Sequence, residues 1–398
     1  MALEIRAATA EEMPEMSRQA ARQLGLSPSM FQGMHPDWTL CGFEDGQVVT
    51  TYAAWPLQIR FNGPPAKIAG VTWVSTHPAY RRRGNLRAIT RRHFEQLHEQ
   101  GEVAMAGLHP AWMAIYQRYG YGTVNIRHSY RVEPRNLVFA HALEAPGELR
   151  EVDLESEFGL LVDVYRTFRE QRNGLVHRGR AMWDAGPLSA PPPGHQQTIL
   201  AYEEDGEPQG YVVYHAGPGG GGSGAYLRVM DLFALNPRAH RAIWETLAAY
   251  DNVGEIRWDS APADDPLPNM IVEPRLLNTS TSDGIMARFV TLEDALTQRP
   301  YPELADLRFE LRDDFCEWNS GRWRLETDVE ASAVSRIDGE SVDLTLTPDT
   351  LASMVWGRIS ATDAARAGLL EVHDERSLAR WDAALRTKYT PYEAEHTW

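Results

Sequence analysis

The sequence predicts an α+β fold built from three successive domains, over residues 1–133, 134–290 and 291–398. Length is the first observation, because 398 residues exceed what one hydrophobic core usually organises. The second is the alternation of strand-like and helix-like hydrophobic runs along the chain. The third is that the middle of the chain repeats the order strand, strand, strand, helix, strand of the first domain. This repetition indicates a duplicated fold, followed by a different one.

In the first domain, the alternating runs at 46–63 and 66–77 predict two strands. A helix is predicted over 84–100, because Leu86, Ile89, Phe94 and Leu97 share one face, and Gly101 is placed to end it. A short apolar strand at 103–108, a helix at 111–120 and a strand at 123–133 complete the domain.

In the second domain, a helix near 155–172 and a proline-rich loop at 186–194 precede a predicted hairpin at 198–205 and 208–215. A strand at 225–235, a helix at 237–251 and a strand at 255–260 follow. In the third domain, strands are predicted near 307–313, 322–327, 333–338 and 341–346, and helices near 348–356, 361–368 and 375–387. Strands followed by helices are typical of an α+β domain with a single sheet.

Composition narrows the function classes. The chain has 55 acidic and 39 basic residues, a net charge of -16, which argues against nucleic acid as a partner. It contains no apolar run of about 18 residues and begins with no signal-peptide pattern, so we expect a cytoplasmic protein without a membrane partner. Cys41 and Cys316 lack metal-ligand spacing, so we expect two reduced thiols and no metal.

Positive charge is nevertheless concentrated in one segment around Gly84. Six arginines fall within twelve positions, namely Arg81, Arg82, Arg83, Arg87, Arg91 and Arg92. Glycine lets backbone N–H groups converge where the predicted helix begins, and the helix N-terminus adds positive potential. Arginines on the same turn add bidentate hydrogen bonds. The segment therefore predicts a site for a pyrophosphate.

A second glycine-rich stretch is not expected to bind a nucleotide. Gly217, Gly219 and Gly222 fit the spacing G-x-G-x-x-G, but the residues from 225 onward read as a strand instead of the helix that a dinucleotide site requires. We interpret it as a hairpin loop.

Residues 74–92, "VSTHPAYRRRGNLRAITRR", and 114–122, "AIYQRYGYG", resemble the Gcn5-related N-acetyltransferases (GNATs), and most closely the enhanced intracellular survival (Eis) family. The resemblance extends over essentially the whole chain, and "DDFCEWNSGRWRLET" at 313–327 is similar to that family's C-terminal domain. It implies two tandem GNAT-like folds, the second degenerate, followed by a sterol-carrier-like α/β sandwich domain. It also implies an acetyl-CoA-dependent N-acetyltransferase that forms a homohexamer.

The resemblance also implies roles for single residues. Arg81, Gly84 and Leu86 occupy the three places of the superfamily signature Q/R-x-x-G-x-G/A, with leucine replacing the small residue as in the Eis family. The implied cofactor contacts are the backbone of Val74, Ser75 and Thr76 for the pantetheine arm, and Arg82, Arg83, Gly84, Asn85, Leu86 and Arg87 for the pyrophosphate. Two further family contacts, a Ser-Glu pair, are replaced by Ala111 and Trp112. In the second domain, Pro237 stands at the corresponding junction without a glycine turn, so we expect one cofactor site per chain.

Catalysis is assigned in the same way. Tyr116 matches the family's general acid, and the terminal carboxylate of Trp398 matches its base. His77, His109 and His396 are alternative bases, because imidazole titrates near neutrality. Trp73, Trp38 and Asp37 are the candidate acceptor contacts, for an aminoglycoside or a lysine-type amine. A non-enzymatic alternative remains, in which the sterol-carrier-like domain binds a lipid or another apolar ligand.

Overall fold

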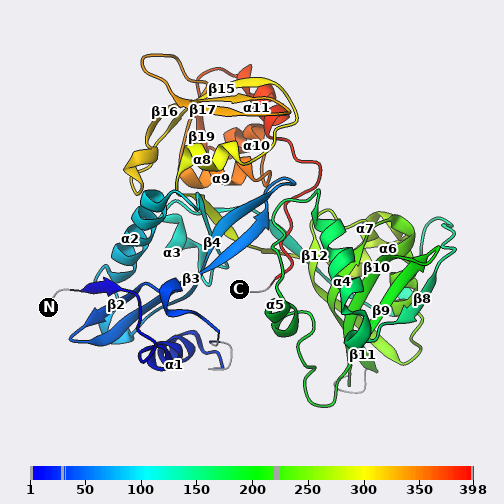
Figure 1. Ribbon diagram of the computed structural model, residues 1–398. Helices are drawn as coiled ribbons and strands as arrows, with labels where there is room; N and C mark the ends of the chain where they lie inside the picture. Colours follow the sequence, from blue (N-terminus) through cyan, green and yellow to red (C-terminus); the bar gives the residue numbers. More distant parts are fainter. Residues whose placement is uncertain (1–2, 28–30, 32, 219–223, 396–397) are drawn as a thin grey trace. The chain divides into compact units, whose positions relative to one another are not determined.

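The computed structural model describes residues 3–27, 31, 33–218, 224–395 and 398. The described strands form three sheets, and the described residues divide into two compact units (Figure 1). One unit holds the chain up to Val124, residues 285–387 and Trp398, and the other holds residues 125–284 and 388–395. The second unit thus includes most of the C-terminal tail.

The first sheet carries the N-terminal copy of the duplicated fold. Its strands, in spatial order, are β1 (Glu4–Arg6), β2 (Cys41–Glu44), β3 (Gln47–Arg60), β4 (Pro65–Thr76), β5 (Met105–Leu108), β14 (Met286–Phe289) and β6 (Gly122–Thr123). Its helices are α1 (Met13–Leu24), α2 (Asn85–Gln100) and α3 (Met113–Gln117). As predicted, α2 buries Ile89, Phe94 and Leu97 and ends at Gly101, whose φ of 68° suits glycine.

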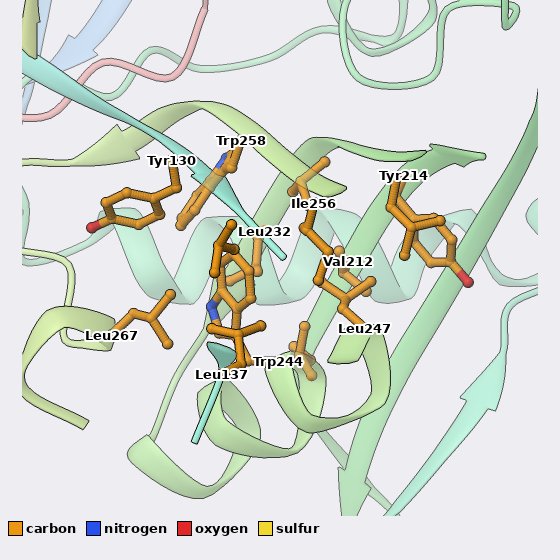
Figure 2. Packing of buried hydrophobic residues seen from close by; sticks show 14 of the residues in the cluster. Tyr130, Leu137, Val212, Tyr214, Leu232, Trp244, Leu247, Ile256, Trp258 and Leu267 are labelled. Carbon is orange, nitrogen blue, oxygen red and sulfur yellow. The ribbon is translucent and has the colours of Figure 1, made fainter. Parts of the chain in front are cut away.

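The second sheet carries the central copy. Its strands, in spatial order, are β13 (Ser280–Asp283), β7 (Ile126–Val132), β12 (Val253–Pro262), β11 (Ala225–Ala234), β10 (Glu207–Gly217), β9 (Gln196–Glu204) and β8 (Glu148–Glu151). Its helices are α4 (Leu154–Arg169), α5 (Arg180–Ala185), α6 (Pro237–Ala248) and α7 (Leu267–Met270). Trp244 of α6 packs against Trp258 of β12 and Tyr130 of β7 in the core on one face of this sheet (Figure 2).

The third sheet belongs to the first unit. Its strands, in spatial order, are β17 (Ala333–Arg336), β16 (Gly321–Thr327), β15 (Ala305–Leu311), β18 (Leu344–Leu346) and β19 (Leu370–Val372). Its helices are α8 (Leu292–Thr297), α9 (Pro348–Val355), α10 (Ala361–Arg366) and α11 (Ser377–Leu385). A buried ion pair of 2.5 Å between Arg288 of β14 and Asp313 ties this domain to the first sheet.

Two strands lie outside the domains in which their sequence order placed them. The strand predicted at 123–133 was assigned to the first domain, but β7 pairs with β12 and β13 of the second sheet. Conversely, β14 falls within the predicted 134–290 domain but pairs with β5 and β6 of the first sheet. The two copies exchange strands because β14, buried along its whole length, fits between two strands of the first sheet. Sequence order alone does not reveal this exchange.

Candidate active site

β4 and β5 diverge in the middle of the first sheet. Their parallel pairing runs from Ala69↔Ala106 to Val71↔Leu108, and β4 then continues to Thr76. The backbone of Trp73, Val74, Ser75 and Thr76 therefore lies past the last residue pair that joins β4 to β5. A strand edge of this kind presents N–H and C=O groups to an extended ligand. Val74, Ser75 and Thr76 are the residues predicted to hold the pantetheine arm, and Trp73 is a predicted acceptor contact.

A bulge fixes the backbone at the divergence. The register of β3 and β4 shifts between Thr51 and Ala53, and Trp73 has a φ of 55°. Such a value is strained for a bulky residue, at a cost of about 1–3 kcal/mol. The Thr51 hydroxyl holds it by donating to the Trp73 carbonyl at 2.6 Å. Strain sustained at a strand opening is typical of a functional site.

The predicted anion site lies just beyond β4. A 3₁₀ turn over Pro78–Tyr80 leads to Arg82, with a φ of 65°, and to Gly84, with a φ of 86°, immediately before α2. A Cβ on Gly84 would meet no atom within 4 Å, so the left-handed backbone and not crowding explains the glycine. No side chain caps the N-terminus of α2, which leaves its first N–H groups for a ligand.

The arginines of this segment differ in their partners. Arg81 donates to the Thr76 carbonyl at 3.0 Å, and Arg83 donates to the Ala79 carbonyl at 2.9 Å and forms an ion pair with Glu44 at 3.5 Å. Among the described residues, Arg82, Arg87 and Arg91 form no ion pair or hydrogen bond through their guanidinium groups, and Arg87 and Arg91 lie over the Phe315 ring at 5.2 and 5.0 Å. Of these, Arg82 and Arg87 lie within three positions of Gly84, and in a chain of net charge -16 they point to an anion as the missing partner.

The other two predicted pyrophosphate contacts face the protein. Asn85 is buried, and its side-chain amide lies 3.5 Å from the Thr50 hydroxyl. Leu86 packs against the hydrophobic core of the domain. Both can therefore offer a ligand only their backbone N–H groups.

Tyr116 lies on α3, in the core of the same domain. It is 9% exposed, and its ring packs edge-on against Tyr121 with centroids 6.0 Å apart. Burial raises the pKa of Tyr116 to about 12. The phenol therefore stays protonated at neutral pH and acts as a hydrogen-bond donor. Ala111 and Trp112, which precede α3, are exposed.

The terminal residue packs beside the paired part of β4 and β5. The Trp398 indole lies edge-on against His109, with centroids 4.4 Å apart. A Cβ on Gly70 would lie 2.5 Å from Leu57 Cδ1 and 3.0 Å from Trp398 Nε1, so the absence of a side chain at this point of β4 makes room for both side chains. A glycine inside a predicted strand was the signal for this close packing in the sequence.

The alternative bases differ in their surroundings. His77 accepts a hydrogen bond from the Ala79 N–H at 3.3 Å and so caps the 3₁₀ turn. His109 contacts Trp398, and His396 lies outside the described residues. Gly219 and Gly222 also lie outside them, but β10 and β11 flank that stretch as antiparallel strands, as expected of a hairpin.

Trp55 links the predicted acceptor residues, because it contacts Trp38 and also packs against the hydrophobic cluster that contains Trp73. Trp38, 38% exposed, packs against Trp55 with centroids 5.5 Å apart, and Asp37 beside it is exposed. Trp73 is buried against Phe31, with centroids 5.1 Å apart. Its indole is thus a core side chain.

The sequence analysis missed a hollow of about 720 Å³ between α1 and the β2–β3 hairpin. Glu11, Glu12 and Glu15 line it, together with His77 and Tyr80. The signal available in the sequence was the acidic run before α1.

In the central copy, the polar groups at the junction between β11 and α6 are bonded to the protein's own side chains. Asn236 caps α6 by accepting a hydrogen bond from the Ala239 N–H at 2.8 Å, and Pro237 follows. Arg238 forms an ion pair with Glu204 at 2.7 Å. Neither the N–H groups nor the arginine are left for an anion, as Pro237 indicated.

Two negative findings concern metals and membranes. The described residues contain no group of three or more His, Cys, Asp or Glu side chains placed to hold a metal ion. Their helices include none that is long and apolar enough to span a bilayer.

Comparison with known proteins assigns families to these domains. Residues 4–124 and 174–289 each match an acetyltransferase (GNAT) domain, and residues 292–394 match a sterol carrier protein domain. An uncharacterized N-acetyltransferase of Streptomyces avermitilis is 29% identical over 364 residues, which cover 88% of this chain and 87% of that protein. N-acetyltransferase Eis of Mycobacterium tuberculosis is 28% identical over 363 residues, which cover 85% and 86%.

A solved structure shows the same fold over the whole chain. A GCN5-related N-acetyltransferase of Anabaena variabilis superimposes with a TM-score of 0.87 at 20% identity, covering 99% of this chain and 100% of that one. The predicted fold class is confirmed, and the GNAT domains together with the names of the homologues support an acyltransferase. The chain thus carries two acetyltransferase (GNAT) domains followed by a sterol carrier protein domain, and over most of its length it is similar to N-acetyltransferases that include Eis.

Proposed function

We propose that this enzyme transfers the acetyl group of acetyl-CoA to an amine of a bulky cationic acceptor, an aminoglycoside or a lysine-type amine. The observation that carries the proposal is the pair of unneutralised arginines, Arg82 and Arg87, at the uncapped N-terminus of α2 and next to the diverging end of β4. That arrangement fits the pyrophosphate and the extended pantetheine arm of the cosubstrate that the GNAT fold implies.

The bound cosubstrate supplies an acetyl thioester, and the chain's own groups orient it. The N–H groups of Val74 and its neighbours on β4 bind the pantetheine amides and polarise the thioester carbonyl. Arg82, Arg83 and Arg87 hold the phosphates, together with the N–H groups that follow Gly84.

Proton movement is divided between two groups. A lysine-type amine has a pKa of about 10.4, so a base must take a proton before the nitrogen can attack. The Trp398 carboxylate is that base, acting through water. Tyr116 donates a hydrogen bond to the leaving sulfur. The hydroxyl then gives its proton to the leaving thiolate and regains one from water. Because the pKa of Tyr116 is about 12, the phenol is protonated again at neutral pH before the next turnover.

The base is tested by adding two glycines after Trp398, which moves the carboxylate away while keeping the indole. We expect kcat to fall roughly a hundredfold, with the KM for acetyl-CoA unchanged, because base catalysis commonly contributes that much. Two glycines added at the N-terminus serve as the control. Full activity of the C-terminally extended enzyme would remove the carboxylate from the mechanism.

The acceptor class is tested by a panel of aminoglycosides, polyamines and lysine peptides, assayed by thiol release. A cationic acceptor follows from the acidic chain and from exposed Asp37 beside Trp38. Activity restricted to neutral amines would contradict it. A homohexamer and a cytoplasmic location belong to the same proposal, and sedimentation velocity measures the first.

A further inference from the structure

The central copy has the same strand divergence as the N-terminal copy. β11 and β12 pair in parallel from Ala225↔Val253 to Val229↔Trp258, and β11 then continues to Ala234. A register shift between β10 and β11 follows Val229, so Asp231 comes directly after the bulge. Ser75 follows the corresponding bulge in β4. Asp231 therefore occupies the place that a pantetheine-binding residue has in the N-terminal copy.

The C-terminal tail contacts both diverging strands of the central copy. The Tyr392 hydroxyl donates to the Ser260 carbonyl of β12 at 2.6 Å. Arg178 joins the tail to β11, because it bonds Glu395 at 2.5 Å and Asp231 at 2.6 Å. The tail thus lies where the acyl donor would lie if this copy had kept its site.

These contacts are buried and mutually satisfied. The side chains of Arg178, Asp231 and Glu395 are 1%, 4% and 6% exposed. Asp231 also accepts a hydrogen bond from the Tyr211 hydroxyl at 2.6 Å, and Arg127 donates to the Glu395 carbonyl at 2.8 Å. Removing the guanidinium would leave Asp231 and Glu395 buried without the ion-pair partner that they share. This network holds the tail through Glu395.

We infer that the central GNAT domain has become a binding site for the chain's own C-terminal tail, in which Arg178 is a positioning residue for the Trp398 carboxylate. The second part rests on the proposed function. From Glu395 the chain needs three residues to reach Trp398, and three residues span at most about 10 Å. Fixing Glu395 therefore keeps the terminal carboxylate within about 10 Å of that residue.

The variants are Arg178→Met, Arg178→Lys and Glu395→Gln. Arg180→Met is the matched control, because Arg180 is exposed, forms an ion pair with Asp184 of its own helix and lies over the Phe158 ring, away from Asp231 and Glu395 in the bonding network. Hydrogen exchange of the peptide 388–398 measures how firmly the tail is held, and kcat and KM measure its effect on acetyl transfer. We expect Arg178→Met to increase exchange in that peptide and to lower kcat about tenfold or more, since a shift of about 1 Å in a reacting group costs on the order of a hundredfold. The KM for acetyl-CoA stays unchanged, and Arg178→Lys restores part of kcat.

The same variants are also made in the chain that carries two glycines after Trp398. This background distinguishes an effect of Arg178 on the position of the carboxylate from an effect on the stability of the whole protein. If Arg178 acts through the carboxylate, Arg178→Met lowers kcat no further in that background. An equal fall in both backgrounds would overturn the positioning role, and unchanged exchange in the tail peptide would overturn the tail-binding site. If the extension itself leaves kcat unchanged, the proposed base is wrong, whereas the exchange result still decides whether Arg178 holds the tail.

Discussion

The N-terminal and central copies of the GNAT fold differ at one junction, where the diverging strand passes into a helix. In the N-terminal copy, Gly84 precedes α2 and no side chain caps the helix. Arg82, two positions earlier, has no carboxylate partner among the described residues. In the central copy, Asn236 caps the helix and Glu204 neutralises Arg238. The strands diverge in both copies. The pairing of the strands is therefore common to the two copies, whereas the polar groups that are left for a ligand depend on the side chains at the junction.

The largest expected effect on kcat concerns the helix that follows β5 in the N-terminal copy and β12 in the central copy. In the N-terminal copy this helix, α3, carries Tyr116, whereas α7, Leu267–Met270, has no tyrosine. Tyr116→Phe keeps the packed ring but removes the hydroxyl. We expect kcat to fall roughly a hundredfold, the usual order for a lost proton donor. Tyr121→Phe, the same change in the neighbouring ring, is the control and keeps its kcat. Steady-state thiol release measures both, and a Tyr116→Phe enzyme with more than half the parent kcat would contradict the role.

The next comparison concerns pH. His93 of α2 is buried and bonds the Tyr52 hydroxyl at 2.8 Å, whereas the buried His240 of the central copy faces the Asp265 carboxylate at 3.0 Å. Burial lowers the pKa of His93 to about 4, below its unfolded value of about 6.5. A lowered histidine pKa means that the unfolded chain binds the proton first, so stability is full above pH 6.5 and is lost as the pH falls toward 4.

Between pH 7.5 and 5.0 we expect this histidine to lower the free energy of unfolding by about 2 kcal/mol. Urea unfolding followed by tryptophan fluorescence measures the change. His93→Gln removes the titrating group and should flatten the pH dependence by that amount. The same slope in the variant and the parent would show that His93 is not the source.

A smaller effect is expected at the arginines. Replacing Arg82 and Arg87 together by alanine should weaken acetyl-CoA binding about tenfold, because charge-assisted hydrogen bonds to the phosphates are lost. The difference should shrink in high salt. Arg92→Ala is the control, since Arg92 lies near Glu95 on the exposed side of α2. Isothermal titration measures the affinity, and an unchanged Kd in the double variant would place the phosphates elsewhere.

The smallest effect is expected at the cap of the central copy. Asn236→Ala removes the bond to the Ala239 N–H and should lower the stability of α6 by about 1 kcal/mol. Hydrogen exchange in α6 measures this change. The affinity for acetyl-CoA should stay the same, because the capped junction does not bind it. Weaker binding in this variant would mean that the two copies are coupled.

Local chemistry made the junctions predictable from the sequence. Gly84 before an amphipathic run predicted both the start of α2 and its free N–H groups, and Pro237 predicted the closed junction of α6. These features depend on residues within a few positions of one another. The six arginines, in contrast, look alike in the sequence. Only packing shows that Arg81 and Arg83 are occupied by nearby carbonyls while Arg82 and Arg87 are not.

The α+β class, the duplication and the glycine turn could be predicted from the sequence, and the family resemblance predicted roles for Tyr116 and Trp398. Which strands complete each sheet, as β14 and β7 show, and where the tail is held became visible only in the folded chain. These two groups of features differ in the sequence separation of the residues involved. Backbone conformation and helix capping follow from neighbouring residues, whereas strand pairing and the burial of Arg178 with Asp231 and Glu395 join residues more than fifty positions apart.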